Sequence, residues 1–377
     1  MTQTLSDSNA PYTLYKSDIS YFSGKLEAYL RYKQINYVSQ DINLKSFDLI
    51  AKNTGVKKMP AVQTANNQWL FDSTPMLQWF EKIYPQHSIM PSDPALRFLV
   101  LMVEDYGDEW LWRPAMWWRW VPKISSRAVG SVIGKEFVGR FLAPILGRYF
   151  SHRQKQEWLY NDGVTKQNEG DVRDMLFREF EFLEPLLEKQ PFIFGSHPSA
   201  ADFGYFASMF RHFGNDYTSV EVMRRQASNC HEWVARLWNA KPARLPKEQQ
   251  WLWPEGDHWQ PLLKRIANDY LPYLAQNAQA HEKGKKRFNH VGQTFTFNNT
   301  KTTHYRVYCL EQLQMQFKAL NKADQDRLHE LFAHTQGLDI LSANTIDSGL
   351  QEAQTLPKQA LNYKQSLKIR LVGQPRN

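Results

Sequence analysis

The chain of 377 residues, with 42% hydrophobic and 22% charged residues, has the composition of a folded protein of two or three domains, which excludes a disordered or a small disulfide-stapled protein. Its formal charge of +8 comes from 46 Lys and Arg against 38 Asp and Glu, with no long cationic block before the last third, so we expect no dedicated nucleic-acid partner. No apolar run approaches the roughly 18 residues of a membrane span, and residues 1–10 lack the apolar segment of a signal peptide, so we expect a cytoplasmic protein without a membrane span.

Residues 11–86 are predicted to form an α/β domain, because short apolar runs typical of strands alternate with helical periodicity. A polar turn follows the first strand, and we expect the next helix to begin near Gly24 with Ser23 as its cap. The last helix of this domain is expected to have Ser73 or Thr74 as its cap and Pro75 in its first turn. The predicted strands are 12–15, 35–42, 60–64 and 68–71, and the predicted helices are 24–33, 47–53 and 74–84.

Pro60 opens the third predicted strand, and proline is tolerated in a sheet only at a first position or at an edge. If the Met59–Pro60 bond is cis, the backbone N–H and C=O of Met59 face outward and can pair with the backbone of a peptide-like ligand. The alternative is an ordinary trans proline in a turn.

Beyond a linker at 84–95 the pattern becomes helical, and we expect an all-helical domain over residues 96–250. Within it, Ser199 and Asp202 have the spacing of a capping box at a helix start. A stretch rich in Pro and Trp precedes an extension over residues 255–377, which is expected to be mostly helical with a hairpin at 288–297 and a tail whose last ten residues are mobile. Cys230 and Cys309 are expected to be buried free thiols, and the scattered His residues make no metal-binding pattern.

This order of elements, together with Met59-Pro60, Asp72-Ser73 and the box at 199–202, resembles the cytosolic glutathione S-transferases over roughly residues 11–240. The resemblance implies a thioredoxin-like first domain that binds glutathione as co-substrate, an all-helical second domain that binds an apolar electrophile, and a homodimer. It also implies a reaction in which the glutathione thiolate attacks that electrophile.

The resemblance assigns roles to particular residues. Met59, before Pro60, pairs with the cysteinyl backbone of glutathione, and Asp72 with Ser73 holds its γ-glutamyl end. The chemistry of the last pair agrees, since Asp72 can accept the ammonium and Ser73, at a helix N-terminus, can bind the α-carboxylate. Lys45 lies where some related classes place a basic residue near the glycyl carboxylate, although a solvated surface lysine is equally consistent with the sequence.

A thiolate needs stabilisation, because a thiol with a pKa near 8.5 is mostly protonated at neutral pH and lowering that pKa by two units takes about 2.7 kcal/mol. Ser20 falls where serine-type transferases keep their catalytic hydroxyl and is the predicted catalytic residue. Tyr21 is the alternative, since other transferase classes use a tyrosine. The same turn also holds Ser17, and a turn in which these hydroxyls are merely solvated stays a third interpretation.

Trp112 and Trp117 are candidates for the electrophile pocket, although aromatic residues at helical spacing are often core residues. The chain departs from the family in its length, since some 120 residues follow the two domains. This extension could cap the cleft, form a dimer surface or bind a partner. A non-catalytic binding or scaffold protein on the same fold therefore stays as the alternative function.

Overall fold

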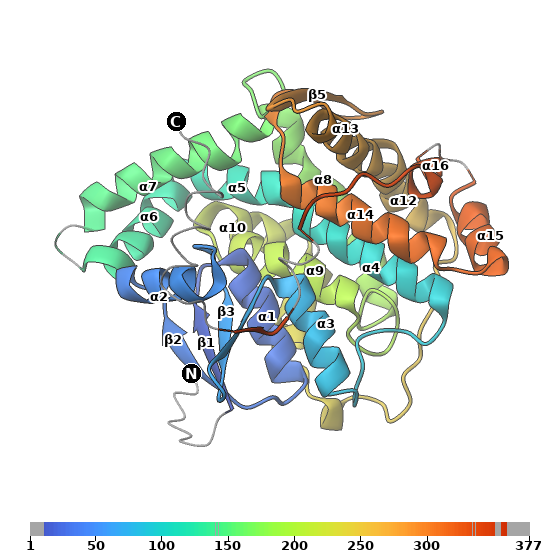
Figure 1. Ribbon diagram of the computed structural model, residues 1–377, viewed down its shortest axis with the longest axis horizontal. Helices are drawn as coiled ribbons and strands as arrows, with labels where there is room; N and C mark the ends of the chain where they lie inside the picture. The colour runs from blue at the N-terminus through green and yellow to red at the C-terminus, as the bar shows by residue number, and fades with distance from the viewer. Residues whose placement is uncertain are drawn as a thin grey trace.

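The computed structural model describes residues 11–350 and 356–359, except for 140, 142, 334 and 336. A small mixed sheet with its helices lies beside a larger helical body, and the C-terminal helices extend that body (Figure 1). This confirms the predicted fold class. Among the described residues, no helix is long and apolar enough to cross a membrane.

The first domain is built on a mixed sheet with the strand order β2-β1-β3-β4-β7. Strands β1 and β2 are parallel, while β3 and β4 are antiparallel neighbours. The fifth strand, β7 (Lys358–Gln359), comes from the C-terminal part of the chain, pairs with β4 and was not predicted. The other elements are β1 (Tyr12–Lys16), α1 (Tyr21–Tyr32), β2 (Tyr37–Asp41), α2 (Leu44–Thr54), β3 (Ala61–Thr64), β4 (Gln68–Phe71) and α3 (Ser73–Ile83).

All three helix starts of this domain differ from the prediction. Helix α2 begins at Leu44, three residues earlier than expected, because Asn43 caps it. Helix α1 begins at Tyr21, with Ser20 as its N-cap, so Ser23 lies inside the first turn. Both serines are residue types that cap helices, and the apolar Tyr21 and Phe22 between them left the choice open. Helix α3 begins at Ser73, so its N-cap position is taken by Asp72, whose φ of 68° keeps that residue out of the helix.

The register of the sheet aligns the ends of its strands. Tyr15 lies opposite Ala61, and Ala61 lies opposite Phe71. Because neighbouring strands are about 4.8 Å apart, the residues that follow β1, precede β3 and follow β4 come together at one end of the sheet. The polar turn at 17–20, Met59–Pro60 and Asp72–Ser73 are those residues.

The helical body begins with α4, which packs against α9. The predicted capping box is confirmed at the start of α9, where the Ser199 N–H donates to Asp202 over 2.9 Å and the Asp202 N–H donates to the Ser199 hydroxyl over 3.3 Å. The elements of this body are α4 (Pro94–Glu109), α5 (Trp112–Trp120), α6 (Lys123–Val138), α7 (Ala143–Trp158), η1 (Tyr160–Asp162), α8 (Glu169–Lys189), α9 (Ala200–Ser208), η2 (Met209–Phe213), α10 (Tyr217–Gln226) and α11 (Ser228–Trp238).

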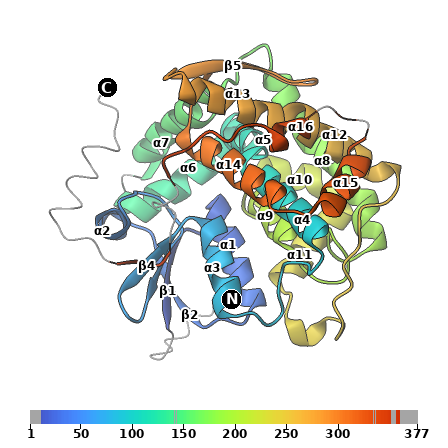
Figure 2. The same cartoon turned by 45° about the vertical axis from the view of Figure 1, so that its right-hand side comes forward.

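The extension packs onto this body, since α14 and α15 both contact α4. Figure 1 and Figure 2 both show α14 alongside α4. The predicted hairpin is present, although it is longer than expected, and the tail predicted to be mobile lies outside the described residues. The elements are η3 (Pro242–Arg244), η4 (Asp257–Trp259), α12 (Gln260–Arg265), η5 (Ile266–Tyr270), α13 (Leu271–Glu282), β5 (Arg287–Val291), β6 (Thr296–Lys301), α14 (His304–Lys318), α15 (Lys322–Leu331) and α16 (Asp339–Ser342).

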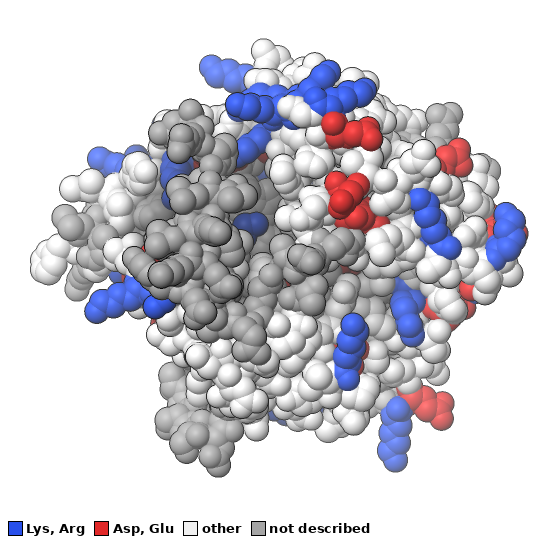
Figure 3. All heavy atoms as spheres, in the orientation of Figure 1, with Lys and Arg blue, Asp and Glu red and all other residues white. Residues whose placement is uncertain are grey.

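One hydrophobic cluster runs from Leu14 in the sheet to Leu341 in the extension, so the sheet, the helical body and the extension share a core. Cys230 and Cys309 are buried free thiols, as predicted. Positive charge gathers on the extension, where residues 283 and 285–287 are exposed Lys and Arg. Figure 3 shows these side-chain types crowded over α13 and β5.

Candidate functional site

Ser20 stands at the sheet end described above, at the N-cap of α1. Its hydroxyl oxygen accepts a hydrogen bond from the Ser23 N–H over 3.3 Å, and its side chain is only partly buried. The hydroxyl proton has no acceptor among the described residues, so it can be donated to an anion. The partial positive charge of the helix N-terminus acts at the same place. Ser20 therefore offers the two features that stabilise a thiolate.

Tyr21, the alternative catalytic residue, has its side chain buried against the helical body. It is 1% exposed, and its hydroxyl donates to the backbone carbonyl of Gly107 in α4 over 2.6 Å. Burial holds the pKa of this phenol well above its usual value. The hydroxyl proton of Tyr21 is thus already used in a hydrogen bond between the sheet domain and the helical body.

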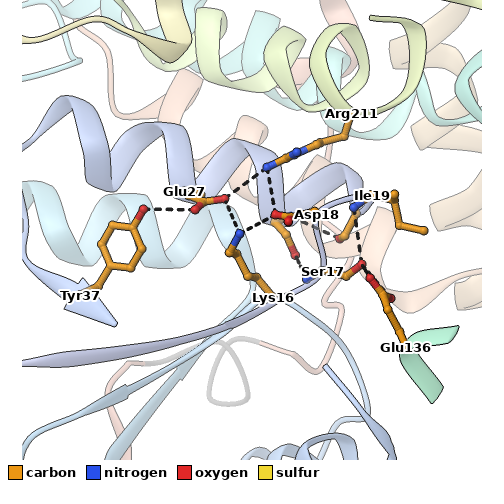
Figure 4. A network of polar contacts seen from close by, with 10 residues as sticks. Lys16, Ser17, Asp18, Ile19, Glu27, Tyr37, Glu136 and Arg211 are labelled. Atoms are coloured by element: carbon orange, nitrogen blue, oxygen red, sulfur yellow. Dashed lines mark hydrogen bonds and ion pairs between the residues drawn. The ribbon is translucent and has the colours of Figure 1, made fainter. Parts of the chain in front are cut away.

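The turn before α1 is held by a polar network that Figure 4 shows. The Lys16 ammonium pairs with Asp18 at 2.5 Å and with Glu27 at 3.1 Å. Arg211, from the helical body, approaches the same two carboxylates at 3.4 and 3.3 Å. These charges fix the path of the chain directly before Ser20.

A second contact in Figure 4 joins the two domains through Ser17 and Glu136. The buried Ser17 hydroxyl lies 3.0 and 3.1 Å from the two carboxylate oxygens of Glu136 in α6 and donates to them. Partial burial raises the pKa of Glu136 to about 7, against the lowering effect of the Ser17 hydrogen bond. Sequence reasoning missed Glu136, because it lies 119 residues from Ser17 and no local pattern marks it.

The Met59–Pro60 peptide bond is cis, so the alternative of a trans proline in a turn is excluded. Met59 is partly exposed, and no hydrogen bond joins its backbone to another residue that the structure describes. The backbone polar groups of Met59 are therefore available to an extended ligand at this end of the sheet.

Asp72 and Ser73 mark the N-terminus of α3. Ser73 is buried at the first helical position, and Asp72 is partly buried before it. Burial raises the pKa of Asp72 even though Lys58 and a hydrogen bond from Tyr305 lower it. That bond, from the Tyr305 hydroxyl in α14 to Oδ1 of Asp72, is 3.0 Å long and was not foreseen, since 233 residues separate the partners.

Lys45 is exposed in the first turn of α2, after the end of β2. Since β2 pairs with β1 in parallel, its C-terminal end lies at the same end of the sheet as Ser20. The position fits the predicted role but does not distinguish it from that of a surface lysine.

The two candidate tryptophans point in different directions. Trp112, at the start of α5, stacks on Phe22 of α1 with their rings 5.8 Å apart and 12° from parallel. Trp117 contacts Trp118, and five residues of helix place it about 140° around α5 from Trp112. Trp112 therefore lies next to the start of α1 and Ser20, whereas no ring contact joins Trp117 to that region within the described part of the chain.

A buried cluster of charged and polar side chains joins α1 and α3 of the first domain to α4 of the helical body. The Lys25 ammonium of α1 donates to Glu104 and Asp108, which lie one turn apart on α4. It also donates to the Thr74 hydroxyl, beside Ser73, over 3.1 Å. Burial disfavours the charge of Lys25, but the two carboxylates outweigh that effect and raise its pKa. The cluster ties the start of α3 to the helical body.

No group of three or more His, Cys, Asp and Glu residues is arranged to hold a metal ion in the part of the chain that the structure describes. The arrangement at the sheet end instead suits a small peptide-like anion. It combines two helix N-termini, a hydroxyl donor, one carboxylate and the backbone of Met59, which bonds to no other residue in the described part of the chain.

Comparisons with known proteins agree with this reading of the fold. Residues 14–88 match the family model described as glutathione S-transferase, N-terminal domain, and residues 155–236 match the model described as glutathione S-transferase, C-terminal domain. No curated protein matches the chain.

Among solved structures, a glutathione S-transferase from Rhodospirillum rubrum F11 is 16% identical, with a TM-score of 0.40 and coverage of 60% of this chain and 88% of that one. The beta-etherase LigF from Sphingobium sp. strain SYK-6 is 20% identical, with a TM-score of 0.42 and coverage of 62% and 96%. FzlA from C. crescentus is 14% identical, with a TM-score of 0.40 and coverage of 60% and 87%. Both of the family's domain models are matched, in their own order, by the two segments that hold the site and the capping box, so these two segments belong to the glutathione S-transferase family.

Proposed function

We propose that this chain is a glutathione transferase, an enzyme in which the thiolate of bound glutathione attacks an apolar electrophile. The observation that carries the proposal is the register of the sheet, which brings Ser20, Met59 and Asp72 with Ser73 to one end. Each of these residues suits a different part of the tripeptide.

Glutathione would lie across this end of the sheet. The Asp72 carboxylate would accept the ammonium of the γ-glutamyl end, while Ser73 and the N-terminus of α3 would bind its α-carboxylate. The backbone N–H and C=O of Met59 would pair with the backbone of the cysteinyl residue, since main-chain groups can bind an extended peptide in this way. The thiol would then lie near the start of α1, where Ser20 is the cap.

Ser20 would act by donating a hydrogen bond from its hydroxyl to the sulfur, so that the thiol loses its proton to water and the resulting thiolate is stabilised. The sulfur lone pair then forms a bond to an electrophilic carbon, and the electron pair displaced from that carbon leaves with the departing group or moves onto an acceptor within the substrate. We choose Ser20 over Tyr21 because the Tyr21 proton is already donated to Gly107.

The electrophile would bind on the side of the helical body. Trp112 is partly exposed and stacks on Phe22, so it can offer an apolar wall close to Ser20. Trp117 is less suited to this wall, because its ring contact lies on another side of α5. We further propose that the protein is cytoplasmic and that, like the family it resembles, it forms a homodimer, which light scattering would measure.

One observation favours a second function. Helix α14 of the extension contacts Asp72 at the proposed site, which suits a protein that binds a ligand or partner without turning it over. Turnover of an electrophile panel with bound glutathione separates the two functions.

Calorimetric titration with glutathione tests the proposal. The wild-type protein should bind at or below millimolar concentration, and Asp72→Asn should weaken binding at least tenfold because the ammonium loses a charged acceptor. Asp326→Asn is the matched control, since Asp326 lies on α15 and pairs with Lys322. The proposal is wrong if the wild-type protein fails to bind, or if both substitutions have the same effect.

A further inference from the structure

The C-terminal extension reaches into the proposed glutathione site through Tyr305. Its hydroxyl donates to Oδ1 of Asp72 over 3.0 Å, and the Lys58 ammonium lies 5.5 Å from the centre of its ring. Both family-model matches end before α14 begins at His304. The contact therefore joins a residue of the segment that matches the family's N-terminal domain to a helix that lies outside both matches.

Helix α14 is fixed in place, so Tyr305 does not belong to a mobile lid. The next residue, Arg306, pairs with Glu109 at 3.1 Å and with Asp162 at 2.5 Å, and all three groups are largely buried. Further along the helix, Phe317 packs on Phe98 of α4 with ring centres 5.4 Å apart. Moving Tyr305 away would require these buried ion pairs to break.

The space between α14 and its neighbours is also nearly filled. The cavity lined by Thr74, Pro75, Tyr305 and Tyr308 has a volume of about 30 Å³, which is room for about one water molecule. Tyr305 thus has little freedom to turn away from Asp72. Whatever ligand reaches Asp72 meets the Tyr305 hydroxyl beside it.

The chemistry of the pair suits an arriving ammonium. A carboxylate has about four lone-pair sites, and Tyr305 donates to Oδ1 of Asp72. A phenol hydroxyl that donates its proton still accepts hydrogen bonds through its oxygen. An ammonium bound to Asp72 would therefore find a second acceptor in Tyr305.

We propose that Tyr305 is a positioning residue of the glutathione site, which orients the Asp72 carboxylate and completes its pocket for the free ammonium of the γ-glutamyl end. The inference rests on the proposed function. The extension is accordingly part of the ligand site, and it determines specificity for a ligand that carries that ammonium.

The test compares two ligands by calorimetric titration. Glutathione carries the ammonium, and glutaryl-cysteinylglycine is the same molecule without its amino group. Tyr305→Phe removes only the hydroxyl and should raise the Kd for glutathione about tenfold, as expected for a hydrogen bond in a charged pair, while leaving the Kd for the analogue unchanged. Tyr308→Phe is the matched control, because Tyr308 lines the same cavity and should change neither Kd.

A double variant tests whether Asp72 and Tyr305 act on the same part of the ligand, which a small change in packing would not produce. Asp72→Asn and Tyr305→Phe should weaken glutathione binding by less in combination than the product of their separate effects, because both act through one ammonium. The inference is overturned if Tyr305→Phe binds glutathione as well as or better than the wild type, or if it loses both ligands equally. Failure of the wild type to bind glutathione contradicts the proposed function and this inference together, whereas binding that depends on Asp72 alone contradicts only the inference.

Discussion

The hydroxyl of Tyr21, the first residue of α1, donates a hydrogen bond of 2.6 Å to the backbone carbonyl of Gly107 in α4. Tyr21→Phe should therefore leave the pKa of bound glutathione unchanged and lower the free energy of unfolding by about 1 kcal/mol, the usual worth of one hydrogen bond. Ultraviolet titration of the bound thiol and urea denaturation measure the two effects. A thiol pKa that rises by one unit or more would return the catalytic role to Tyr21.

The buried Lys25 stabilises the fold by pairing with Glu104 and Asp108. Lys25→Met should lower the free energy of unfolding by about 3–5 kcal/mol, because two carboxylates are left in the interior without a cation. Adding Glu104→Gln and Asp108→Asn should restore most of that loss, and urea denaturation of the three proteins provides the comparison. A triple variant less stable than Lys25→Met would show that the pairing is not the cause.

Glu136 should give the protein a measurable pH dependence of stability. Its folded pKa is about 7, above the ordinary value of 4.5, so between these pH values the folded state binds more protons than the unfolded state. Stability from this group is therefore lost as the pH rises from about 4.5 to 7, by about 1–2 kcal/mol after allowance for partial exposure. Glu136→Gln should remove this slope in denaturation curves measured at several pH values, and identical slopes in the two proteins would contradict the assignment.

Asp202 should matter more to stability than its partner in the capping box. Besides Ser199, its Oδ1 accepts hydrogen bonds from the Ile193 N–H at 2.9 Å and the Trp233 indole at 3.0 Å. Ser199→Ala should cost about 1 kcal/mol, the typical worth of an N-cap. Asp202→Ala should cost about 3 kcal/mol or more, because two buried donors lose their acceptor. Equal losses in thermal or urea unfolding would show that the extra bonds contribute nothing.

Local signals account for what the sequence predicted correctly. The first domain was predictable because its strands are short apolar runs, and Gly55 ends α2 in the left-handed conformation that glycine favours. Proline fits the first position of a strand, and Pro60 directly precedes β3; the expectation of an exposed edge was wrong, because β3 lies between β1 and β4. The Ser199–Asp202 box is a pattern of four residues. The start of α1 was placed three residues late, because two serines of the same turn both suit a cap.

The rest of the site depends on contacts between distant parts of the chain. Glu136 reaches Ser17 from α6, and Tyr305 reaches Asp72 from α14. Each of these residues lies on a helix whose own pattern reports only which face is buried, so nothing local indicates the partner. The spacing of Trp112 and Trp117 explains why they point in different directions, but which of the two contacts α1 depends on how the helices pack.

The most direct test of the account is the ultraviolet titration of the glutathione thiol bound to the wild-type protein and to Ser20 variants. Ser20→Ala should raise the thiol pKa by about one to two units, because the thiolate loses its hydroxyl donor. Ser20→Thr should keep the wild-type pKa, since threonine retains both the hydroxyl and the N-cap. A thiol pKa that is the same in all three proteins would contradict the account.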